Sequence, residues 1–286
     1  MAIDYQKLLA LKIPEVVHRY AEKDTILYAL GLGLGQDPMN EGELTYVYEK
    51  NLRALPTMAV VLGYPGFWIR DLDTGIDWVK LLHGEQGVRL HQPLPARGDV
   101  VGVTRVVDVV DKGPGKGALV YTERSIVDRA SGKPLATLTQ TTFCRGDGGF
   151  GGPQRDTPKP HALPERDPEL ICDWATRPET ALIYRLNGDF NPLHAEPAAA
   201  KAAGFPRPIM HGLATFGVAG YALVKTVCGN DPSRLEAVHA RFSAPVFPGE
   251  TIRTEMWRDG WRVSFRARAV ERDVIVINNG VAEIRM

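Results

Sequence analysis

Apolar and polar positions follow the same plan in each half of the chain. Residues 24–38, DTILYALGLGLGQDP, combine a capping residue (Asp24 or Thr25), a short apolar run and a glycine-rich exit, which predicts a short helix and a turn. Residues 178–192, PETALIYRLNGDFNP, repeat these features with Thr180 as the expected cap. The repetition predicts two structural units of similar construction.

Alternating apolar and polar residues follow each of these helical segments. Residues 88–110 and 240–260 each contain a strand pattern, a proline-containing turn that ends in Gly-Asp or Gly-Glu, and a second strand pattern. Residues 118–145 and 261–285 continue with alternating runs around the turns SGK and ERD, which is typical of antiparallel strands. Each half therefore predicts helices followed by antiparallel strands, an α+β pattern.

One segment of the second half predicts a helix that is buried on every side. Residues 211–229, HGLATFGVAGYALVKTVCG, are apolar almost all round, and Gly217 and Gly220 inside this helix are explained if a sheet wraps closely around its backbone. The first-half counterpart, residues 56–68, is weaker, and we expect Pro65 to end it early. We therefore predict a double hot-dog fold, with an antiparallel sheet wrapped around a central helix in each repeat. A shortened first helix leaves space for a ligand beside its sheet.

The two halves are separated by residues 146–168, a stretch rich in Gly, Pro and charged residues and nearly free of apolar ones. Such a composition is typical of a linker that lies over the surface. The predicted organisation is an N-terminal repeat over residues 1–148, a linker over 149–167 and a C-terminal repeat over 168–286.

Charge and cysteine content narrow the classes of partner. The 34 Lys and Arg residues balance 34 Asp and Glu residues, so no net field favours nucleic acid or an anionic membrane. The first residues do not resemble a signal peptide, no apolar run approaches the roughly 18 residues of a membrane span, and the ending AEIRM is not a peroxisomal address. The cysteines, Cys144, Cys172 and Cys228, are widely spaced, which suits a reducing compartment. We expect a cytoplasmic protein without nucleic-acid or membrane partners.

Two motifs of the second half carry the candidate chemistry. Residues 184–194, YRLNGDFNPLH, place Asp189 and His194 five positions apart, and residues 205–212, FPRPIMHG, lead into the buried helix. Together they resemble the signature of the hydratase 2 (MaoC-like) enoyl-CoA hydratases, and the first-half phrases YALGLGLG, LPTMAVVLG and LHGEQ resemble the N-terminal repeat of the two-repeat members. The resemblance implies reversible hydration of a trans-2-enoyl-CoA to an (R)-3-hydroxyacyl-CoA, without metal or redox cofactor, by a homodimer.

The residue types in these motifs suit that reaction. Addition of water to a conjugated thioester needs a base for the water, an acid for the α-carbon and donors for the enolate oxygen. Asp189 and His194 are the candidates for proton transfer, with Asn191 as a candidate for positioning the water or the pair. The backbone N–H of Gly212 is the candidate oxyanion donor, because it lies at the start of a helix.

Structural explanations compete with these roles. Asn191 suits the cap of a helix over residues 192–203 that ends before Gly204, Asp189 suits a turn after a glycine, and His194 suits a surface position. Three further residues are candidate substrate contacts, each with a structural alternative. His211 either touches substrate or holds the loop before the helix, and Lys201 and Arg207 either bind CoA phosphates or are solvated charges.

Aligning the repeats at Tyr28 and Tyr184 without gaps places Gly33 opposite Asp189 and Pro38 opposite His194. Neither Gly33 nor Pro38 can transfer a proton, so we expect a single active site in the second repeat. The resemblance to two-repeat enzymes implies that the first repeat accommodates the acyl tail, which favours medium, long or bulky chains.

Several alternatives remain open from the sequence. The other candidate functions are a dehydratase of a branched or dicarboxylic CoA ester or of an acyl-carrier protein, a hot-dog acyl-CoA thioesterase, and a non-catalytic acyl-CoA-binding subunit. A metal site formed by Asp189, His194 and His211 lacks a supporting ligand spacing.

Overall fold

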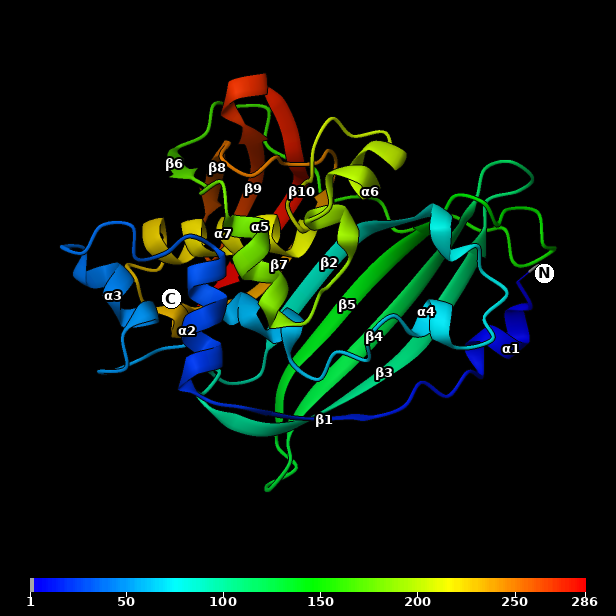
Figure 1. Ribbon diagram of the computed structural model, residues 1–286, viewed down its shortest axis with the longest axis horizontal. Helices are drawn as coiled ribbons and strands as arrows, with labels where there is room; N and C mark the ends of the chain where they lie inside the picture. Colours follow the sequence, from blue (N-terminus) through cyan, green and yellow to red (C-terminus); the bar gives the residue numbers. More distant parts are fainter. Residues whose placement is uncertain (1–2) are drawn as a thin grey trace.

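Ten strands form one antiparallel sheet in the computed structural model, which describes residues 3–286, and helices cover one face of this sheet (Figure 1). The strands are β1 (Val16–Tyr20), β2 (Leu81–Leu90), β3 (Gly98–Asp111), β4 (Ala118–Asp128), β5 (Pro134–Cys144), β6 (Leu170–Ala175), β7 (Leu235–Phe242), β8 (Thr251–Asp259), β9 (Arg262–Ala269) and β10 (Val274–Ile284).

The helices are short apart from one. The α-helices are α1 (Tyr5–Leu9), α2 (Glu22–Gly31), α3 (Glu41–Val47), α4 (Trp68–Asp71), α5 (Thr180–Tyr184), α6 (Pro197–Ala202) and α7 (Gly212–Thr226). Single-turn or 3₁₀ segments are η1 (Pro56–Val61), η2 (Trp78–Lys80), η3 (Arg185–Asn187), η4 (Pro192–His194), η5 (Pro232–Arg234) and η6 (Val270–Arg272).

The strand order shows two repeats of the same topology. Across the sheet the order is β1-β3-β4-β5-β2-β7-β10-β9-β8-β6. Counted from its outer edge inward, each half of the sheet therefore contains the first, third, fourth, fifth and second strands of its own repeat. The halves meet where β2 pairs with β7, in a ladder from Glu85–Arg241 to Arg89–Ala237. The expected α+β double hot-dog fold is confirmed.

The long helix α7 is the buried central helix that the sequence predicts. Residues 214–224 are all buried. The reason for its glycines differs from the expected one, because their closest neighbours are helical segments of the first repeat rather than the sheet. A Cβ on Gly220 would lie 2.4 Å from Thr57 in η1, and one on Gly217 would lie 2.7 Å from Leu32 just after α2. The glycines therefore let the two repeats approach each other.

The first repeat has a six-residue 3₁₀ segment, η1, where the second has the fifteen-residue α7. The segment η1 ends earlier than the position expected from Pro65. The helical run stops at Val61, and Gly63 then adopts a φ of +53°. Gly63 packs backbone to backbone on Gly102 of β3, where a Cβ would lie 2.2 Å from the Gly63 carbonyl oxygen. The chain therefore crosses the sheet closely at Gly63, just after η1, the short central helix of the first repeat, has ended.

Three expected helix boundaries are wrong. Helix α2 begins after Ala21, and Asp24 lies inside its first turn, where its carboxylate accepts a hydrogen bond from Ala21 N–H at 2.8 Å. Helix α5 has Glu179 at its N-cap, while the Thr180 hydroxyl accepts a hydrogen bond from Arg177 N–H.

The helix expected over residues 192–203 is broken into η4 and α6. Pro197 disfavours helical geometry at the residue before it and offers no N–H, so the chain leaves the helix at Ala195 and restarts after Glu196. Gly204 does lie beyond the end of α6 in a left-handed conformation, with Phe205 N–H donating to the Ala200 carbonyl.

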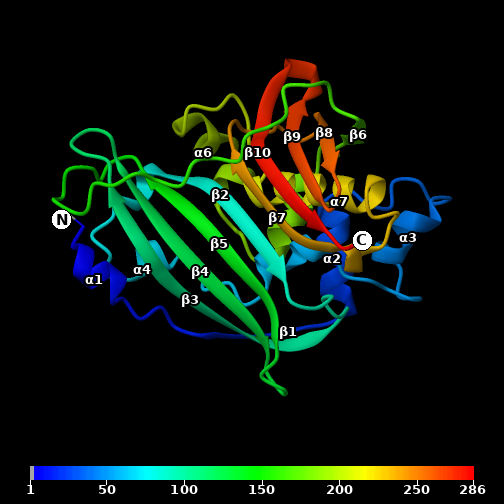
Figure 2. The same cartoon turned by 180° about the vertical axis from the view of Figure 1, so that it is seen from behind.

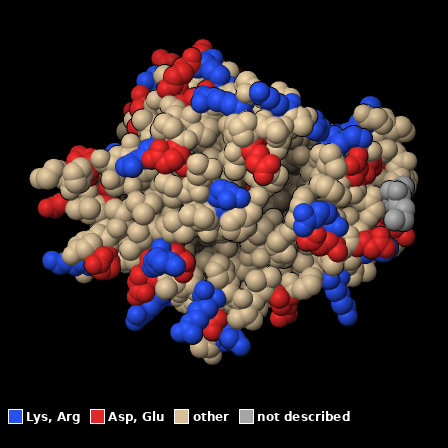
Figure 3. Space-filling model, in the orientation of Figure 1, with Lys and Arg blue, Asp and Glu red and all other residues tan. Residues whose placement is uncertain are grey.

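The segment between β5 and β6 crosses the face of the sheet opposite the helices, as Figure 2 shows. At its start the Asp111 carboxylate accepts hydrogen bonds from Gly149 and Gly151 N–H. At its end Asn279 of β10 donates to the His161 carbonyl, and the His161 ring bonds Ser264 of β9. Basic and acidic side chains are interspersed over the face seen in Figure 3. Among the described residues, no helix has the length and apolar content needed to span a membrane.

The Gly63–Gly102 crossing generates a stability prediction. Gly102→Ala places a methyl group against rigid backbone, so we expect the free energy of unfolding to fall by about 1–3 kcal/mol. Val103→Thr, at the half-exposed next residue of the same strand, is the matched control and is expected to change it by less than about 0.5 kcal/mol. Urea unfolding of both variants measures the difference, and equal stability of the two would contradict the crossing.

Candidate active site

A cavity of about 810 Å³ lies between the two repeats. Its walls come from η1 and the loop after it, from β2, β4 and β5 of the first sheet half, and from the motif loop, the start of α7 and the end of β7. The cavity therefore occupies the space that the short η1 leaves open. Asp189, Asn191, His194 and Gly212 all line it.

The motif loop turns sharply at Gly188, whose φ of +113° is costly for any other residue. Two side chains of this loop, those of Asp189 and Asn191, then accept hydrogen bonds from the backbone. The Asp189 carboxylate accepts a hydrogen bond from Asn191 N–H at 3.2 Å, and the Asn191 side chain accepts one from Leu193 N–H at 3.0 Å. Asn191 is thus the N-cap of η4, as the structural explanation predicts, while it also borders the cavity. One Asp189 oxygen is used in the turn, and the partly exposed carboxylate still faces the cavity.

His194 is held in one tautomer by a backbone carbonyl. Its Nδ1 lies 2.9 Å from the Ile209 oxygen, and because a carbonyl only accepts, Nδ1 carries the hydrogen and Nε2 of the neutral ring carries a lone pair. The side chain is buried, and this burial lowers the pKa of His194 below its ordinary value of 6.5. At neutral pH the ring is therefore an uncharged base.

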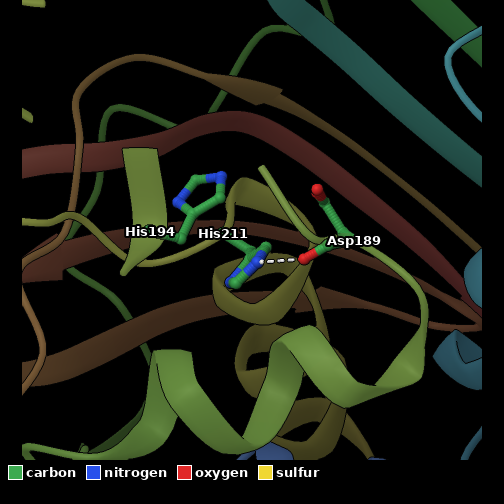
Figure 4. Close-up of side chains that lie close together, drawn as sticks. All are labelled: Asp189, His194 and His211. Carbon is green, nitrogen blue, oxygen red and sulfur yellow. Dashed lines mark hydrogen bonds between the residues drawn. The ribbon is translucent and has the colours of Figure 1, made fainter. Parts of the chain in front are cut away.

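His211 lies directly against His194, as Figure 4 shows. The ring centroids are 3.8 Å apart and the planes are inclined by 29°. His211 Nε2 donates a hydrogen bond to the Asp189 backbone oxygen at 3.2 Å, while its buried Nδ1 has no hydrogen-bond partner among the described residues. Burial, with a further contribution from the neighbouring His194, lowers the pKa of His211 to about 4. The ring does not border the cavity, so it is placed to hold the loop.

Gly212 is the first residue of α7, and no side chain among the described residues caps this helix. Its first N–H groups therefore point out of the helix toward the cavity end. The three atoms nearest to a Cβ on Gly212 would all belong to the Phe242 ring, the closest at an ordinary contact distance of 3.4 Å. The packing of the protein around this Cβ position therefore does not by itself require glycine there.

Two predicted substrate contacts lie away from this cavity. Lys201 is exposed on α6, and Arg207 donates to the Pro248 carbonyl at 3.2 Å and stacks over the Phe247 ring. Neither residue borders the cavity. The cations that do border it are Lys112 and Arg241, which sequence reasoning missed because they lie in strand regions far from both motifs.

The three residues Asp189, His194 and His211 each offer one ligand atom within 4.8 Å of the others. A metal ion lies in the plane of each imidazole that binds it, about 2.0–2.1 Å from the nitrogen. Two stacked rings 3.8 Å apart and inclined by 29° do not share such a point. The geometry suits a water molecule between Asp189 and His194 better than a metal ion.

Comparisons with known proteins cover both repeats. Residues 159–280 match the family described as "MaoC like domain", and residues 18–146 match "MFE-2 hydratase 2 N-terminal domain". The chain is 39% identical to "Enoyl-CoA hydratase 2, peroxisomal" of Arabidopsis thaliana, over 97% of this chain and 94% of the relative. It is 41% identical to "3-hydroxyacyl-thioester dehydratase Y" of Mycobacterium tuberculosis, over 99% of both chains. Among solved structures, a MaoC-like dehydratase from Phytophthora capsici superposes with a TM-score of 0.88 at 33% identity, over 99% of this chain and 98% of that one.

The lowered pKa of the buried His211 ring leads to a prediction about the pH dependence of stability. The pKa of His211 is lower in the folded chain, about 4, than the ordinary 6.5, so the unfolded chain takes up a proton first as the pH falls. Its contribution to stability is therefore complete above pH 6.5 and is lost between 6.5 and about 4. We expect His211→Gln to reduce the loss of unfolding free energy between pH 7.5 and 5 by about 1–2 kcal/mol.

Urea unfolding at several pH values measures this slope. His91→Gln is the matched control, because the His91 ring is exposed and bonds Thr137 at the surface. If both variants keep the slope of the parent chain, His211 is not the group that titrates.

Proposed function

Because this chain belongs to the MaoC-like hydratase 2 family, we propose that it is a hydro-lyase that adds water reversibly to trans-2-enoyl-CoA and yields the (R)-3-hydroxyacyl-CoA. One observation supports the assignment most strongly. A carboxylate, a neutral imidazole with a free Nε2 and the start of a buried helix border the same cavity. Dehydration of 3-hydroxyacyl thioesters is the same reaction in reverse and uses the same groups.

The catalytic roles that we propose follow from the atoms that face the cavity. An oxygen of Asp189 and a ring nitrogen of His194 lie within 4.8 Å, a distance that a single bound water spans with two hydrogen bonds. The pair removes a proton from this water as its oxygen attacks the β-carbon, and returns a proton to the α-carbon. General acid–base catalysis of this kind contributes roughly 10²–10⁴-fold to the rate.

The electrons displaced by the attack move to the thioester oxygen, which becomes an enolate oxygen in the transition state. Gly212 N–H at the start of α7 is the proposed donor to this oxygen, because the helix dipole and the unpaired N–H both favour negative charge there. Such a donor is typically worth about 10²–10³-fold. Asn191 is proposed to fix the loop that positions the pair, through its hydrogen bond to Leu193 N–H.

The first repeat is proposed to hold the acyl tail. Its short η1 leaves apolar residues such as Val60 and Val61 on the cavity wall, and a fifteen-residue helix there, as in the second repeat, would fill this space. The repeat has Gly33 and Pro38 where the second has Asp189 and His194, so it contributes space and no second reaction centre.

The location and assembly of the protein are also proposals. The three cysteines are free and buried, which is consistent with a reducing compartment such as the cytoplasm. A homodimer is proposed from the family resemblance alone, and light scattering of the purified chain measures its mass.

The hydration reaction and its residues are tested together. Incubation with trans-2-enoyl-CoA is expected to remove the conjugated enoyl absorbance and to give the (R)-3-hydroxy product. Asp189→Asn and His194→Gln are each expected to lower kcat by about 10²–10⁴-fold while the circular dichroism spectrum of the folded chain is retained. Asp37→Asn, on an exposed loop of the first repeat, is the control with the same chemical change. Formation of an (S) product, or of free CoA alone, would contradict the proposed reaction. Near-full activity of the Asp189 or His194 variant would show that the replaced residue does not transfer a proton.

The acyl-tail proposal predicts a dependence on chain length. Val60→Trp narrows the first-repeat side of the cavity, so kcat/KM for a long enoyl-CoA is expected to fall about tenfold or more, while that for crotonyl-CoA changes little. Val103→Trp, at a half-exposed position on β3, is the bulky control. A parent chain that hydrates only the four-carbon substrate would refute the proposal.

A further inference from the structure

The chain contains two Asn–Gly pairs, Asn187–Gly188 and Asn279–Gly280. In such a pair the backbone nitrogen of the glycine can attack the side-chain amide of the asparagine, because glycine has no Cβ to obstruct the approach and has a flexible backbone. The first pair lies in the motif loop, directly before Asp189. The two pairs share the same chemistry, but their surroundings differ.

The pair in the motif loop is held by one turn at the surface. Asn187 is the last residue of η3, and its Nδ2 donates a hydrogen bond to the Tyr184 oxygen at 2.9 Å. Gly188 N–H donates to the Arg185 oxygen at 3.0 Å. Gly188 is exposed, and among the described residues only its own chain neighbours have heavy atoms within 4 Å of the position that a Cβ would take. Opening this turn therefore breaks two local hydrogen bonds and separates no strands.

The second pair is part of the central sheet. It lies in β10 between β7 and β9, where Gly280 is opposite Phe265. Gly280 is buried, and a Cβ on it would lie 2.6 Å from the Phe265 oxygen. The Asn279 Nδ2 donates to the His161 oxygen at 2.8 Å. Ring closure at this pair requires β10 to separate from its neighbours, so the second pair is an internal control for the first.

We propose that Asn187–Gly188 is a site of spontaneous deamidation, and that this modification inactivates the protein as it ages. The Gly188 nitrogen attacks the Asn187 Cγ and forms a C–N bond, its proton passes through solvent to the amide nitrogen that departs, and ammonia leaves. The product is a five-membered succinimide. Water, the only co-reactant, then adds to one of the two ring carbonyls and opens the ring. An aspartate or an isoaspartate remains at position 187.

The isoaspartate product displaces the catalytic carboxylate. It routes the backbone through the former side chain and lengthens it by one C–C bond, about 1.5 Å, two residues before Asp189. The loop is fixed immediately afterwards, because the Asp189 backbone oxygen accepts a hydrogen bond from His211 and its carboxylate accepts one from Asn191 N–H. Misplacement of a reacting group by about 1 Å costs roughly 10²-fold in rate. The inactivation rests on the proposed function, whereas the modification itself does not.

Peptide mapping of aged protein tests the modification. The purified chain is incubated for several days at pH 8, digested, and analysed by mass spectrometry for conversion of amide to carboxylate at each asparagine. We expect conversion at Asn187 to exceed that at Asn279 at least about tenfold, and to be faster at higher pH because the attacking nitrogen must lose its proton. Equal conversion at the two pairs, or none at Asn187, would overturn the proposal.

Hydratase activity toward crotonyl-CoA is followed in the same samples. The parent chain is expected to lose activity in proportion to its isoaspartate content. Asn187→Gln, which would need a six-membered ring, and Asn187→Ser, which has no amide, are each expected to retain their own initial rate over the same period. Treatment of the aged parent with isoaspartyl methyltransferase and S-adenosylmethionine is expected to restore part of the lost rate, because it returns isoaspartate to aspartate.

The outcomes separate this proposal from the proposed function. Isoaspartate at position 187 with full retention of activity would contradict the inactivation, as would an equal loss of activity in the two Asn187 variants. A parent chain that deamidates at Asn187 and not at Asn279, but hydrates no enoyl thioester even when fresh, would support the modification site and overturn the proposed function.

Discussion

Two hydrogen bonds from histidine rings to backbone carbonyls hold the candidate site together. His194, on the motif loop, donates to Ile209 in the segment before α7, and His211, at the N-cap of α7, donates back to Asp189 on the motif loop. The two bonds run in opposite directions between the same pair of segments, and the rings that make them stack. Because each bond also selects a tautomer, the same contacts that fix the loop leave His194 Nε2 free to accept a proton. Charging either ring would place a cation in a buried stack and against its neighbour, so the arrangement also keeps both rings neutral.

The difference between the repeats arises from where glycine permits close contact. In the second repeat, glycines inside α7 admit Thr57 and Leu32 from the first repeat, and the helix continues for fifteen residues. In the first repeat, Gly63 meets Gly102 at the sheet, and the helix stops after six. The same topology thus gives a second repeat filled by a long central helix and a first repeat whose shorter helix borders a cavity. Both halves border the cavity, because the candidate groups Asp189, His194 and Gly212 come from the second repeat, while η1, β2, β4 and β5 of the first repeat form the other walls.

The sequence was sufficient for the plan of the molecule and for the residues of the motif. Repeated patterns predicted two repeats, and the all-round apolar character of residues 212–226 predicted a buried helix. Local boundaries were less predictable. Ala21 is the N-cap of α2 because the Asp24 side chain, three residues later, bonds its N–H, and Pro197 divides the helix that Asn191 and Gly204 were expected to delimit. The stacking of His211 on His194 depends on a tertiary approach across seventeen residues, for which no local pattern exists. Lys112 and Arg241 border the same cavity although they come from distant parts of the chain, which is a property of the assembled sheet.

The pairing of β2 with β7 also has a consequence for synthesis of the chain, because the two strands are far apart in the sequence. Strand β2 ends at Leu90, but its partner β7 begins at Leu235, so about 145 residues must be made before the edge of β2 is covered. At about 5–20 residues per second, this edge stays open for roughly 7–30 seconds on the ribosome. An uncovered strand edge recruits other strands, and copies of the first repeat on neighbouring ribosomes carry the same edge. The duplicated architecture therefore gives the nascent chain a period in which this edge of β2 is open to other strands, and this period ends only when the second repeat is made.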